Sequence, residues 1–222
     1  MTSARITLYS GPLSMFGAKT QIAALEKGLD FDLVMVPYDS KQGYNPKHPE
    51  VLRINPKRQV PVLTHGDVEI FDSTQIFEYL EDIAPSPPLW PLEPAARARA
   101  RSLEHRSDEV FFPHIIKLMG LQDALASEPA IAAIDSANRF YAAMEQQLQG
   151  DWLAGSYSFA DIAFYMAALF GERQSAPLTE ATPRLLAWRE RMIQRAPVRT
   201  VVSAMAAWLE AAGRPVPAFM TR

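Results

Sequence analysis

The first third of the chain alternates between short apolar runs and a longer stretch with helical spacing. Residues 5–9 (RITLY) and 31–36 (FDLVMV) are rich in β-branched and aromatic side chains, as strands are. Between them, residues 17–27 carry apolar side chains at helical spacing, and Gly28 follows as a typical helix end. A strand, a helix and a strand in this order predict a right-handed βαβ unit with parallel strands.

The next segment predicts a loop, a hairpin and a helix. Residues 39–56 are polar and rich in turn formers, with little periodicity, and we expect a loop there. Residues 60–71 (VPVLTHGDVEIF) predict a β-hairpin that turns at residues 65–67. Residues 72–83 (DSTQIFEYLEDI) have apolar side chains at helical spacing. The predicted order of the first domain is therefore βαβ, loop, ββα.

A break in composition follows this domain. Residues 84–94 (APSPPLWPLEP) contain five prolines, which fit poorly into a helix interior. We interpret them as a stiff linker between a first domain, residues 1–83, and a second domain, residues 95–222.

Every element predicted beyond the linker is helical. We expect helices over 95–118 and 130–148, one that begins near Ser158, one at Thr182-Pro183, and one from about Pro197 to Gly213. The predicted fold class is α/β plus all-α: a small βαβ-ββα domain followed by a helical bundle.

The composition narrows the classes of function. The 222 residues carry a formal net charge of −3, whereas nucleic-acid binding needs a concentrated basic surface. No apolar stretch approaches the roughly 18 residues of a membrane span, and the N-terminus lacks the apolar core of a secretory signal. The absence of cysteine excludes disulfides and cysteine nucleophiles and fits a reducing cytoplasm. The four histidines show no metal-binding spacing, so we expect no metal, no nucleic acid and no membrane partner.

Ser14 stands where the first predicted strand gives way to the first predicted helix. One interpretation is an N-cap, because the first backbone N–H groups of a helix lack partners. The other is that its hydroxyl and the helix N-terminus together bind an anion. A thiolate is the relevant anion, since both groups lower the pKa of a thiol. Because the chain has no cysteine, that thiol would come from a second molecule.

Two further signals lie in the same predicted domain. Pro61 follows Val60 in a strand-like run, so it either begins the strand or marks a special backbone. Asp72 and Ser73 precede a helix, and each is a candidate N-cap. Alternatively, Ser73 and the helix N-terminus bind a carboxylate while Asp72 binds an ammonium group. Together with Ser14, these signals describe a clamp for a small charged peptide.

Four segments, in this order, resemble the cytosolic glutathione transferase family. Residues 8–32 (LYSGPLSMFGAKTQIAALEKGLDFD) resemble the first strand–helix–strand of the family, and residues 55–63 (NPKRQVPVL) resemble its NPxxxVPxL segment, in which the proline is cis. Residues 71–80 (FDSTQIFEYL) resemble its xESxAIxxYL segment. Residues 155–168 (GSYSFADIAFYMAA) resemble its buried capping-box helix. In the last segment, Ser158 and Asp161 are spaced for reciprocal capping.

The resemblance implies a thioredoxin-like N-terminal domain that binds glutathione and a helical C-terminal domain that shapes the pocket for the second substrate. It also implies a homodimer. Ser14 matches the catalytic serine of the zeta, phi, tau and theta-like classes. Asp72 and Ser73 match the residues that hold the γ-glutamyl end of glutathione. Val60 matches the residue that pairs with the cysteinyl backbone, and Gln59 lies near the glycyl end.

Some positions leave alternatives open. Tyr9 and Ser10 lie close to the position used by tyrosine-class enzymes, and both are also explained as strand residues. Many family members have Gly-Lys where this chain has Arg-Gln before Val60. The candidate cations for the glycine carboxylate are then Arg58, Lys57 and His48.

The expected function is that of a glutathione S-transferase, which ionises the thiol of its co-substrate glutathione for attack on a small hydrophobic electrophile in detoxification. Candidate residues of the acceptor pocket are Phe111, Phe112 and His105, with interdomain or dimer packing as the alternative for the aromatic pair. A different class is a non-catalytic glutathione-binding or assembly module of the same fold. A specialised isomerase, dehalogenase or peroxidase would use the same thiolate.

Overall fold

The structure is a computed structural model that describes residues 5–39, 43–44 and 47–221. Within them, four strands form one sheet in the order β2-β1-β3-β4. They are β1 (Ile6–Ser10), β2 (Phe31–Met35), β3 (Val62–His65) and β4 (Val68–Phe71). β2 runs parallel to β1, and β3 and β4 form an antiparallel hairpin with β3 antiparallel to β1. The predicted βαβ unit and hairpin are both confirmed.

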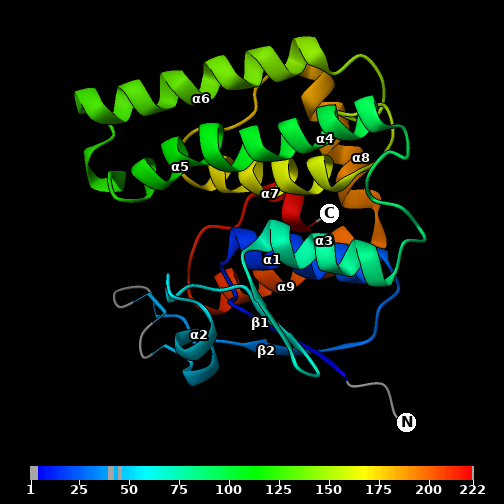
Figure 1. Cartoon of the computed structure of the whole chain (residues 1–222). Helices are drawn as coiled ribbons and strands as arrows, with labels where there is room; N and C mark the ends of the chain where they lie inside the picture. Colours follow the sequence, from blue (N-terminus) through cyan, green and yellow to red (C-terminus); the bar gives the residue numbers. More distant parts are fainter. Residues whose placement is uncertain (1–4, 40–42, 45–46, 222) are drawn as a thin grey trace.

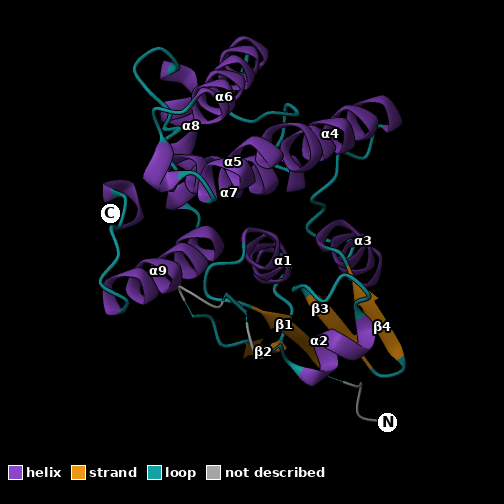
Figure 2. Cartoon of the chain, turned by 90° about the vertical axis from the view of Figure 1, so that its left-hand side faces the viewer, coloured by secondary structure: helices purple, strands orange, loops and turns teal. Residues whose placement is uncertain are grey.

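Helices cover both faces of this sheet, as Figure 2 shows. α1 (Met15–Glu26) and α3 (Ser73–Ile83) lie on the face toward the rest of the molecule, and α2 (Pro49–Ile54) lies on the opposite side. α2 falls inside the segment that the sequence predicts as a loop, so that prediction is wrong there. The helix has only six residues, too few for a periodic pattern, and begins with a proline after His48, whose Nδ1 accepts a hydrogen bond from the N–H of Glu50.

The remaining helices are α4 (Pro94–Arg106), α5 (Phe112–Met119), α6 (Glu128–Gln147), α7 (Phe159–Arg173), α8 (Pro183–Gln194) and α9 (Ala196–Ala211). The first five form the bundle in the upper half of Figure 1, and α9 lies below it. The single helix predicted over 95–118 is interrupted, because a π-helical turn (Ser107–Phe111) joins α4 to α5. α7 runs through the centre of the bundle and is buried from Phe159 to Gly171. The α/β plus all-α fold class is confirmed.

α9 departs from a simple division into two domains. It leaves the bundle and packs against α1, beside the sheet (Figures 1 and 2). The ring of Trp208 on α9 lies 5.4 Å from that of Tyr38, which follows β2. The first domain is therefore covered in part by the last long helix.

The predicted capping box at the start of α7 is present. The Asp161 carboxylate accepts hydrogen bonds from the N–H and hydroxyl of Ser158 at 3.0 and 3.1 Å. Its other oxygen accepts from the N–H of Leu153 and from Nε1 of Trp188, both at 3.0 Å. Burial raises the pKa of Asp161 to about 6. This one carboxylate therefore fixes three separate segments of the bundle.

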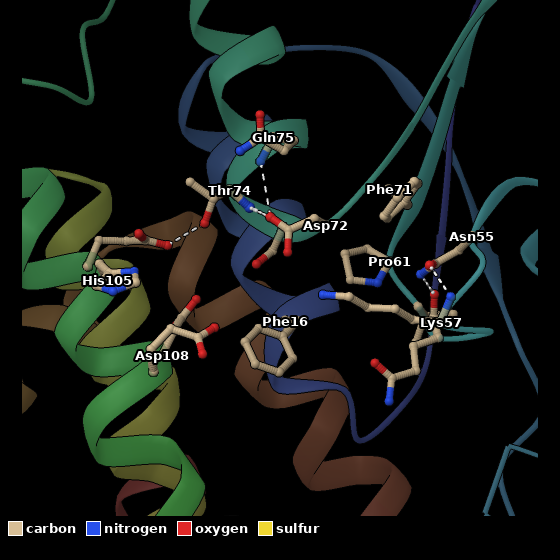
Figure 3. A pocket seen from close by; sticks show the side chains of 15 residues that line it. Phe16, Asn55, Lys57, Pro61, Phe71, Asp72, Thr74, Gln75, His105 and Asp108 are labelled. Carbon is tan, nitrogen blue, oxygen red and sulfur yellow. Dashed lines mark hydrogen bonds between the residues drawn. The ribbon is translucent and has the colours of Figure 1, made fainter.

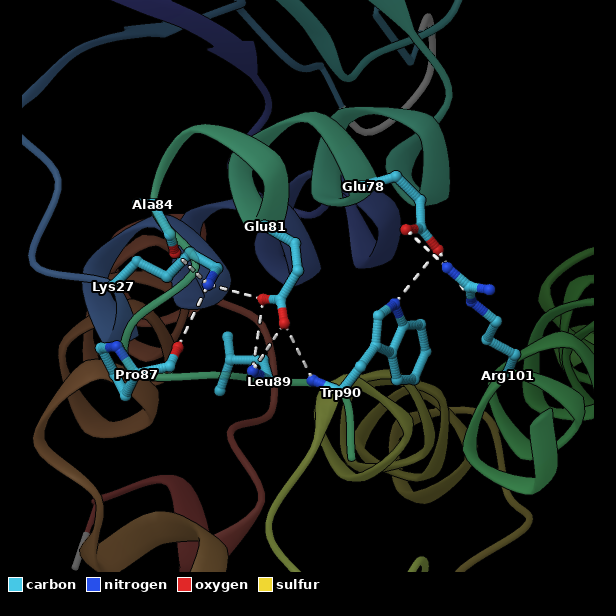
Figure 4. A network of polar contacts seen from close by, with 8 residues as sticks. All are labelled: Lys27, Glu78, Glu81, Ala84, Pro87, Leu89, Trp90 and Arg101. Carbon is cyan, nitrogen blue, oxygen red and sulfur yellow. Dashed lines mark hydrogen bonds and ion pairs between the residues drawn. The ribbon is translucent and has the colours of Figure 1, made fainter. Parts of the chain in front are cut away.

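The proline-rich segment between α3 and α4 is held along its length by two glutamates of α3 (Figure 4). Glu81 accepts hydrogen bonds from the N–H groups of Leu89 and Trp90, at 3.1 and 3.2 Å, and pairs with Lys27, which follows α1. Glu78 accepts from Nε1 of Trp90 at 3.1 Å and forms an ion pair with Arg101 of α4 at 3.0 Å. The segment is thus anchored to the α/β domain by its backbone rather than stretched freely between two bodies.

Candidate functional site

Two neighbouring cavities lie between the carboxyl-end loops of the sheet and the bundle. The first, of about 400 Å³, is lined mainly by polar groups from α3, α4 and the loop before β3, and we call it the polar cavity (Figure 3). The second, of about 310 Å³, is lined mainly by apolar side chains, and we call it the apolar cavity. Phe16, Gln59 and Val60 line both, so the two cavities are adjacent compartments of one cleft.

Ser14 lies at the start of α1, where it lines the apolar cavity. It is the N-cap, and its Oγ accepts a hydrogen bond from the N–H of Gly17 at 2.9 Å. No acceptor for its own hydroxyl hydrogen is present among the described residues. A side chain at position 17 would collide, because a Cβ there would lie 2.1 Å from Oγ of Ser10 and 3.0 Å from that of Ser14. Gly17 therefore lets the helix begin close against both hydroxyls.

The two alternative hydroxyls, Tyr9 and Ser10, are directed elsewhere. Ser10 is fully buried, and its Oγ accepts a hydrogen bond from Nε2 of Gln21 at 2.7 Å. The ring of Tyr9 packs at 5.0 Å from that of His48. Of these three hydroxyls, that of Ser14 alone lines one of the two cavities.

Gln59 and Val60 lie on the loop that leads into β3. The Nδ2 group of Asn55 donates to the carbonyl of Gln59 at 2.6 Å, which fixes this loop against the end of α2. The peptide bond between Val60 and Pro61 is cis, as the resemblance implied. Both Gln59 and Val60 face the cleft, at the boundary of its polar and apolar compartments.

Asp72 and Ser73 form the α3 side of the polar cavity. Asp72 is the N-cap of α3, with Oδ1 accepting from the N–H groups of Thr74 and Gln75 at 3.1 and 3.4 Å. Its backbone φ is +77°, an uncommon conformation for a residue with a side chain. Only Oδ2 of Asp72 is then left to meet a ligand, while Ser73 lies buried in the first turn of the helix.

The candidate cations for a terminal carboxylate lie around the same loop. Lys57 lines the polar cavity, whereas Arg58 and His48 line the apolar one, together with Lys47. Arg58 has a left-handed backbone with φ of +56°, which turns the chain just before Gln59. All three candidate cations thus line the cleft, distributed on both sides of the loop.

The bundle side of the polar cavity carries a buried ion cluster. Nζ of Lys19, on α1, lies 2.8 Å from Oε1 of Glu104 and also pairs with Oδ2 of Asp108. The hydroxyl of Thr74 donates to the same Glu104 oxygen at 2.6 Å. Burial alone would lower the pKa of Lys19, but Asp108 and Glu104 outweigh it and raise that pKa. Burial likewise opposes ionisation of Glu104, yet Lys19 and Thr74 hold its pKa below the usual value.

The predicted acceptor residues separate in the structure. Phe111 is 0% exposed and lies in the bundle core, with its ring 5.1 Å from Phe140 and 5.0 Å from Tyr141. Its assignment to the acceptor pocket is therefore wrong. Its ring packs against residues of α6 instead of the cleft, as the alternative of packing had allowed.

Phe112 and His105 line different compartments. Phe112 lines the apolar cavity and makes edge contacts with Phe16 and Phe170 at 5.4 and 5.9 Å. His105 lines the polar cavity (Figure 3) and so does not form part of the apolar one. Of the three candidates, Phe112 thus lines the apolar cavity and His105 lines the polar cavity.

Comparison with known proteins agrees with this geometry. Residues 8–88 match the family model described as the glutathione S-transferase N-terminal domain, and residues 106–196 match that of the C-terminal domain. Glutathione S-transferase 1 of Dianthus caryophyllus is 32% identical over 166 residues, which cover 71% of this chain and 70% of that protein. The chain belongs to the cytosolic glutathione S-transferase family.

Two further members help to place this glutathione S-transferase homologue. A stringent starvation protein A homologue of Coxiella burnetii is 35% identical over 116 residues, a match that spans about half of each protein (51% of both). A glutathione S-transferase of Methylobacillus flagellatus, solved with glutathione bound, superposes with a TM-score of 0.77 at 25% identity. That superposition covers 88% of this chain and 98% of the other. The fold therefore corresponds to that of the other protein over nearly its full length.

Several cleft residues of this family member were not predicted. Glu104 and Asp108 line the polar cavity, and Tyr44, Ile116 and Phe170 line the apolar one. Lys19 shares a helical face with the buried Ile22 and Ala23, a position where a lysine requires a buried carboxylate. That pattern was the available signal for the ion cluster.

The described part of the chain shows neither a metal-binding cluster nor a membrane-spanning helix. Within it, no cluster of three or more His, Cys, Asp or Glu side chains suitable for a metal ion occurs. Over the same residues, no helix is long and apolar enough to cross a membrane.

Proposed function

We propose that this protein is a glutathione transferase in which Ser14 stabilises the thiolate of glutathione for attack on a small apolar electrophile. The observation that carries the proposal is the position of Ser14. Its hydroxyl caps the first turn of α1 and lines the apolar compartment of a cleft whose polar compartment adjoins it. A thiolate at the boundary would meet a hydroxyl donor and a helix N-terminus together, with an apolar space beside it.

The polar groups of the cleft suit the three residues of glutathione. In this arrangement, Ser73 and the N-terminus of α3 bind the γ-glutamyl carboxylate, and Oδ2 of Asp72 approaches the ammonium group. The backbone of Val60 pairs with the cysteinyl residue. The glycyl carboxylate lies near Gln59 and one of the neighbouring cations described above, among which Lys57 shares the polar cavity.

The energy required of Ser14 is modest. A free thiol has a pKa of about 8.5 and is only a few per cent ionised at neutral pH. Lowering that pKa to about 6.5 requires roughly 2.7 kcal/mol of selective thiolate stabilisation. A hydrogen bond to a charged group contributes about 1.5–3 kcal/mol and a helix N-terminus about 0.3–1 kcal/mol, so together they suffice.

The apolar cavity favours a hydrophobic acceptor. Its walls include the rings of Phe16, Phe112 and Phe170, which meet edge to face. Aromatic walls of this kind bury flat apolar groups through area and ring geometry. We therefore expect activated aryl halides and similar electrophiles to be better substrates than small polar ones.

The test is the pH dependence of turnover in Ser14→Ala. We expect kcat/KM with an activated aryl halide at pH 7 to fall about 10- to 100-fold, and the apparent pKa of its pH profile to rise by one to two units. The loss should shrink at high pH, where glutathione ionises without help. Tyr9→Phe serves as the matched control and should keep the wild-type profile. Full activity of Ser14→Ala with an unchanged profile would refute the role of Ser14.

A second candidate function is a binding or assembly module without turnover. It is favoured by the relationship to a protein named for stringent starvation rather than for transfer, over half the chain. Glutathione affinity chromatography followed by assays with aryl halides, peroxides and isomerisable substrates discriminates between the two. Retention on the column without consumption of glutathione in any assay would favour the module.

The proposed assembly is a cytoplasmic homodimer, as in other members of the family. Light scattering of the purified full chain tests it, with twice the mass of 24.8 kDa as the expected result. A mass of one chain at micromolar concentration would contradict this part of the proposal.

A further inference from the structure

A third cavity lies outside the cleft, where the segment that follows α9 meets the end of α7. It has a volume of about 510 Å³, and we call it the tail cavity. Its walls are formed by Gln122, by residues 172–174 at the end of α7, and by residues 214–217 after α9. None of these residues lines the polar or the apolar cavity. The tail cavity is therefore a separate space.

The two helices that border the tail cavity end in the same backbone motif, and each end carries an arginine. At the end of α7, the N–H of Ala176 donates to the carbonyl of Gly171 at 2.9 Å, and Arg173 lies in the last turn. At the end of α9, the N–H of Arg214 donates to the carbonyl of Leu209 at 2.8 Å. Such bonds, made to a carbonyl five residues back, close a helix and fix the residues around its end. The fold thus holds two arginines at one cavity.

These two arginines have no countercharge of their own. Neither Arg173 nor Arg214 forms an ion pair with a carboxylate among the described residues. The guanidinium of Arg173 lies instead over the ring of Phe170, at 5.1 Å from its centroid. Glu172 also lines the cavity, but its carboxylate pairs with Arg189 at 3.2 Å. Burial and the neighbouring Arg214 lower the pKa of Arg173, as expected for a cation that lacks an anion beside it.

The negative ends of the two helices offset only part of this positive charge. A helix C-terminus is equivalent to about −0.5 of an elementary charge. The ends of α7 and α9 together therefore offset about one of the two arginines. The other arginine leaves about one positive charge beside the tail cavity, which an anion would neutralise.

We propose that the tail cavity is a second ligand site, separate from the glutathione cleft, in which Arg173 and Arg214 together bind the carboxylate or phosphate group of a small metabolite. A guanidinium group presents paired N–H donors that match either of these anions. Pro215, Val216 and Pro217 line the same cavity and suit a short apolar body. A ligand bound in this way holds the segment after α9 against α7. The inference does not depend on the proposed function.

The experiment is an NMR titration of the isotope-labelled full chain at pH 7.5, in chloride buffer of constant ionic strength. The probes are butyrate, inorganic phosphate, and butyramide, which is a neutral molecule of the same size as butyrate. The backbone N–H signals of residues 172–174 and 214 report on the tail cavity. The proteins are the wild type, Arg173→Gln, Arg214→Gln, the double variant, and Arg199→Gln as a matched control. Arg199 is an exposed arginine of α9 that does not line the cavity.

We expect at least one of the two anions to shift these signals in a saturable manner, with a Kd of about 1 to 10 mM. The tighter anion identifies the group that the two arginines prefer. Butyramide should bind at least tenfold more weakly than that anion. Arg173→Gln and Arg214→Gln should each weaken it about tenfold, the lower end of the range for a charge-assisted hydrogen bond, and the double variant should show no saturable shift. Arg199→Gln should stay within about twofold of the wild type.

Urea unfolding without any probe gives a second, independent measurement. Because Arg173 and Arg214 repel each other in the empty cavity, we expect Arg214→Gln to unfold at the same urea concentration as the wild type or at a higher one. An arginine that serves only to stabilise the end of α9 would give a lower midpoint on substitution. Addition of the tighter anion should raise the midpoint of the wild type more than that of the double variant. This difference removes the general effect of the salt.

Four outcomes would overturn the inference. If neither anion shifts the signals in a saturable manner, the tail cavity is not an anion site. If the shifts persist in the double variant, another group binds the anion. If butyramide binds as tightly as the tighter anion, the cavity recognises the apolar body and not the charge. If Arg214→Gln unfolds at a lower urea concentration, this arginine serves the helix end.

Discussion

Two lysine side chains eight residues apart, Lys27 at the C-terminal end of α1 and Lys19 within it, are both completely buried but have different surroundings. Lys27 pairs with Glu81 at 2.5 Å and donates to the carbonyls of Ala84 and Pro87 at 2.6 and 3.1 Å (Figure 4). Lys19 instead meets two carboxylates and has no carbonyl partner among the described residues. The first lysine supports the segment that joins α3 to α4, and the second lies behind a cavity.

The difference between them separates a structural contact from a candidate ligand position. Both oxygens of Glu81 are used, by Lys27 and by the N–H groups of Leu89 and Trp90. Around Lys19, an oxygen of Asp108 is left over next to open space. A buried network that is fully paired has no reason to bind anything more. One that is incomplete beside a cavity still has an oxygen that a donor could reach.

Removing the cation of the incomplete cluster should have the largest effect. In Lys19→Met, Glu104 and Asp108 remain buried without a countercharge, and we expect about 5 kcal/mol to be lost from the free energy of unfolding at pH 7.5. Denaturant titration measures this loss. It should be smaller at pH 5, where the two carboxyl groups protonate more readily.

The matched control is the triple variant Lys19→Met, Glu104→Gln, Asp108→Asn. Removal of all three charges should restore most of the lost stability, because no unpaired buried ion remains. A loss below about 1 kcal/mol in Lys19→Met alone would show that the cluster is not electrostatically important.

Breaking the complete network should affect stability but not binding. Glu81→Gln leaves Lys27 with carbonyl partners only, and we expect a loss of about 3 kcal/mol by denaturant titration. The affinity for glutathione, measured by calorimetry on the folded variant, should stay within about twofold of the wild type. A parallel loss of affinity would mean that the two lysine networks are coupled through α1.

The smallest predicted effect is a pH dependence of glutathione binding. Burial raises the pKa of Asp108 to about 6, with Lys19 opposing and Glu104 adding to the rise. The carboxyl is therefore ionised above that pH, and the polar cavity loses one negative charge as the pH falls through it. We expect affinity to drop about tenfold between pH 7.5 and pH 5.

The Asp108→Asn variant isolates the contribution of Asp108 from those of the other groups that line the cavity. Its affinity for glutathione should be weak at both pH values and change less than threefold between them. If Asp108→Asn shows the same tenfold change as the wild type, another group causes it.

Features set by neighbouring residues could be predicted from the sequence. The capping box depends on Ser158 and Asp161, three residues apart, and the hairpin on a turn next to its two strands. Both follow from local backbone requirements. The role of Ser14 as an N-cap also follows from local backbone requirements. Its proposed role in stabilising a thiolate came in addition from the resemblance to a family.

Features set by the three-dimensional arrangement could not be predicted in this way. Lys19 and Asp108 are 89 residues apart in the sequence, and only the packing of α1 against the bundle brings them together. Phe111 was misplaced because a π-helical turn changes the direction of the side chains that follow α4. The sequence did carry a hint of the cluster, since two acidic residues four apart on a partly buried helix repel each other unless a cation lies between them.

The return of α9 to the first domain has a consequence for the timing of biogenesis. Trp208 on α9 packs against Tyr38, which in turn contacts Tyr44, and both tyrosines line the apolar compartment. A nascent chain that has emerged from the ribosome only as far as α8 lacks Trp208. The two tyrosines in the wall of the apolar cavity then have no packing partner from α9. The wall of the apolar cavity is thus completed late in translation, well after the segment that carries Ser14 has been made.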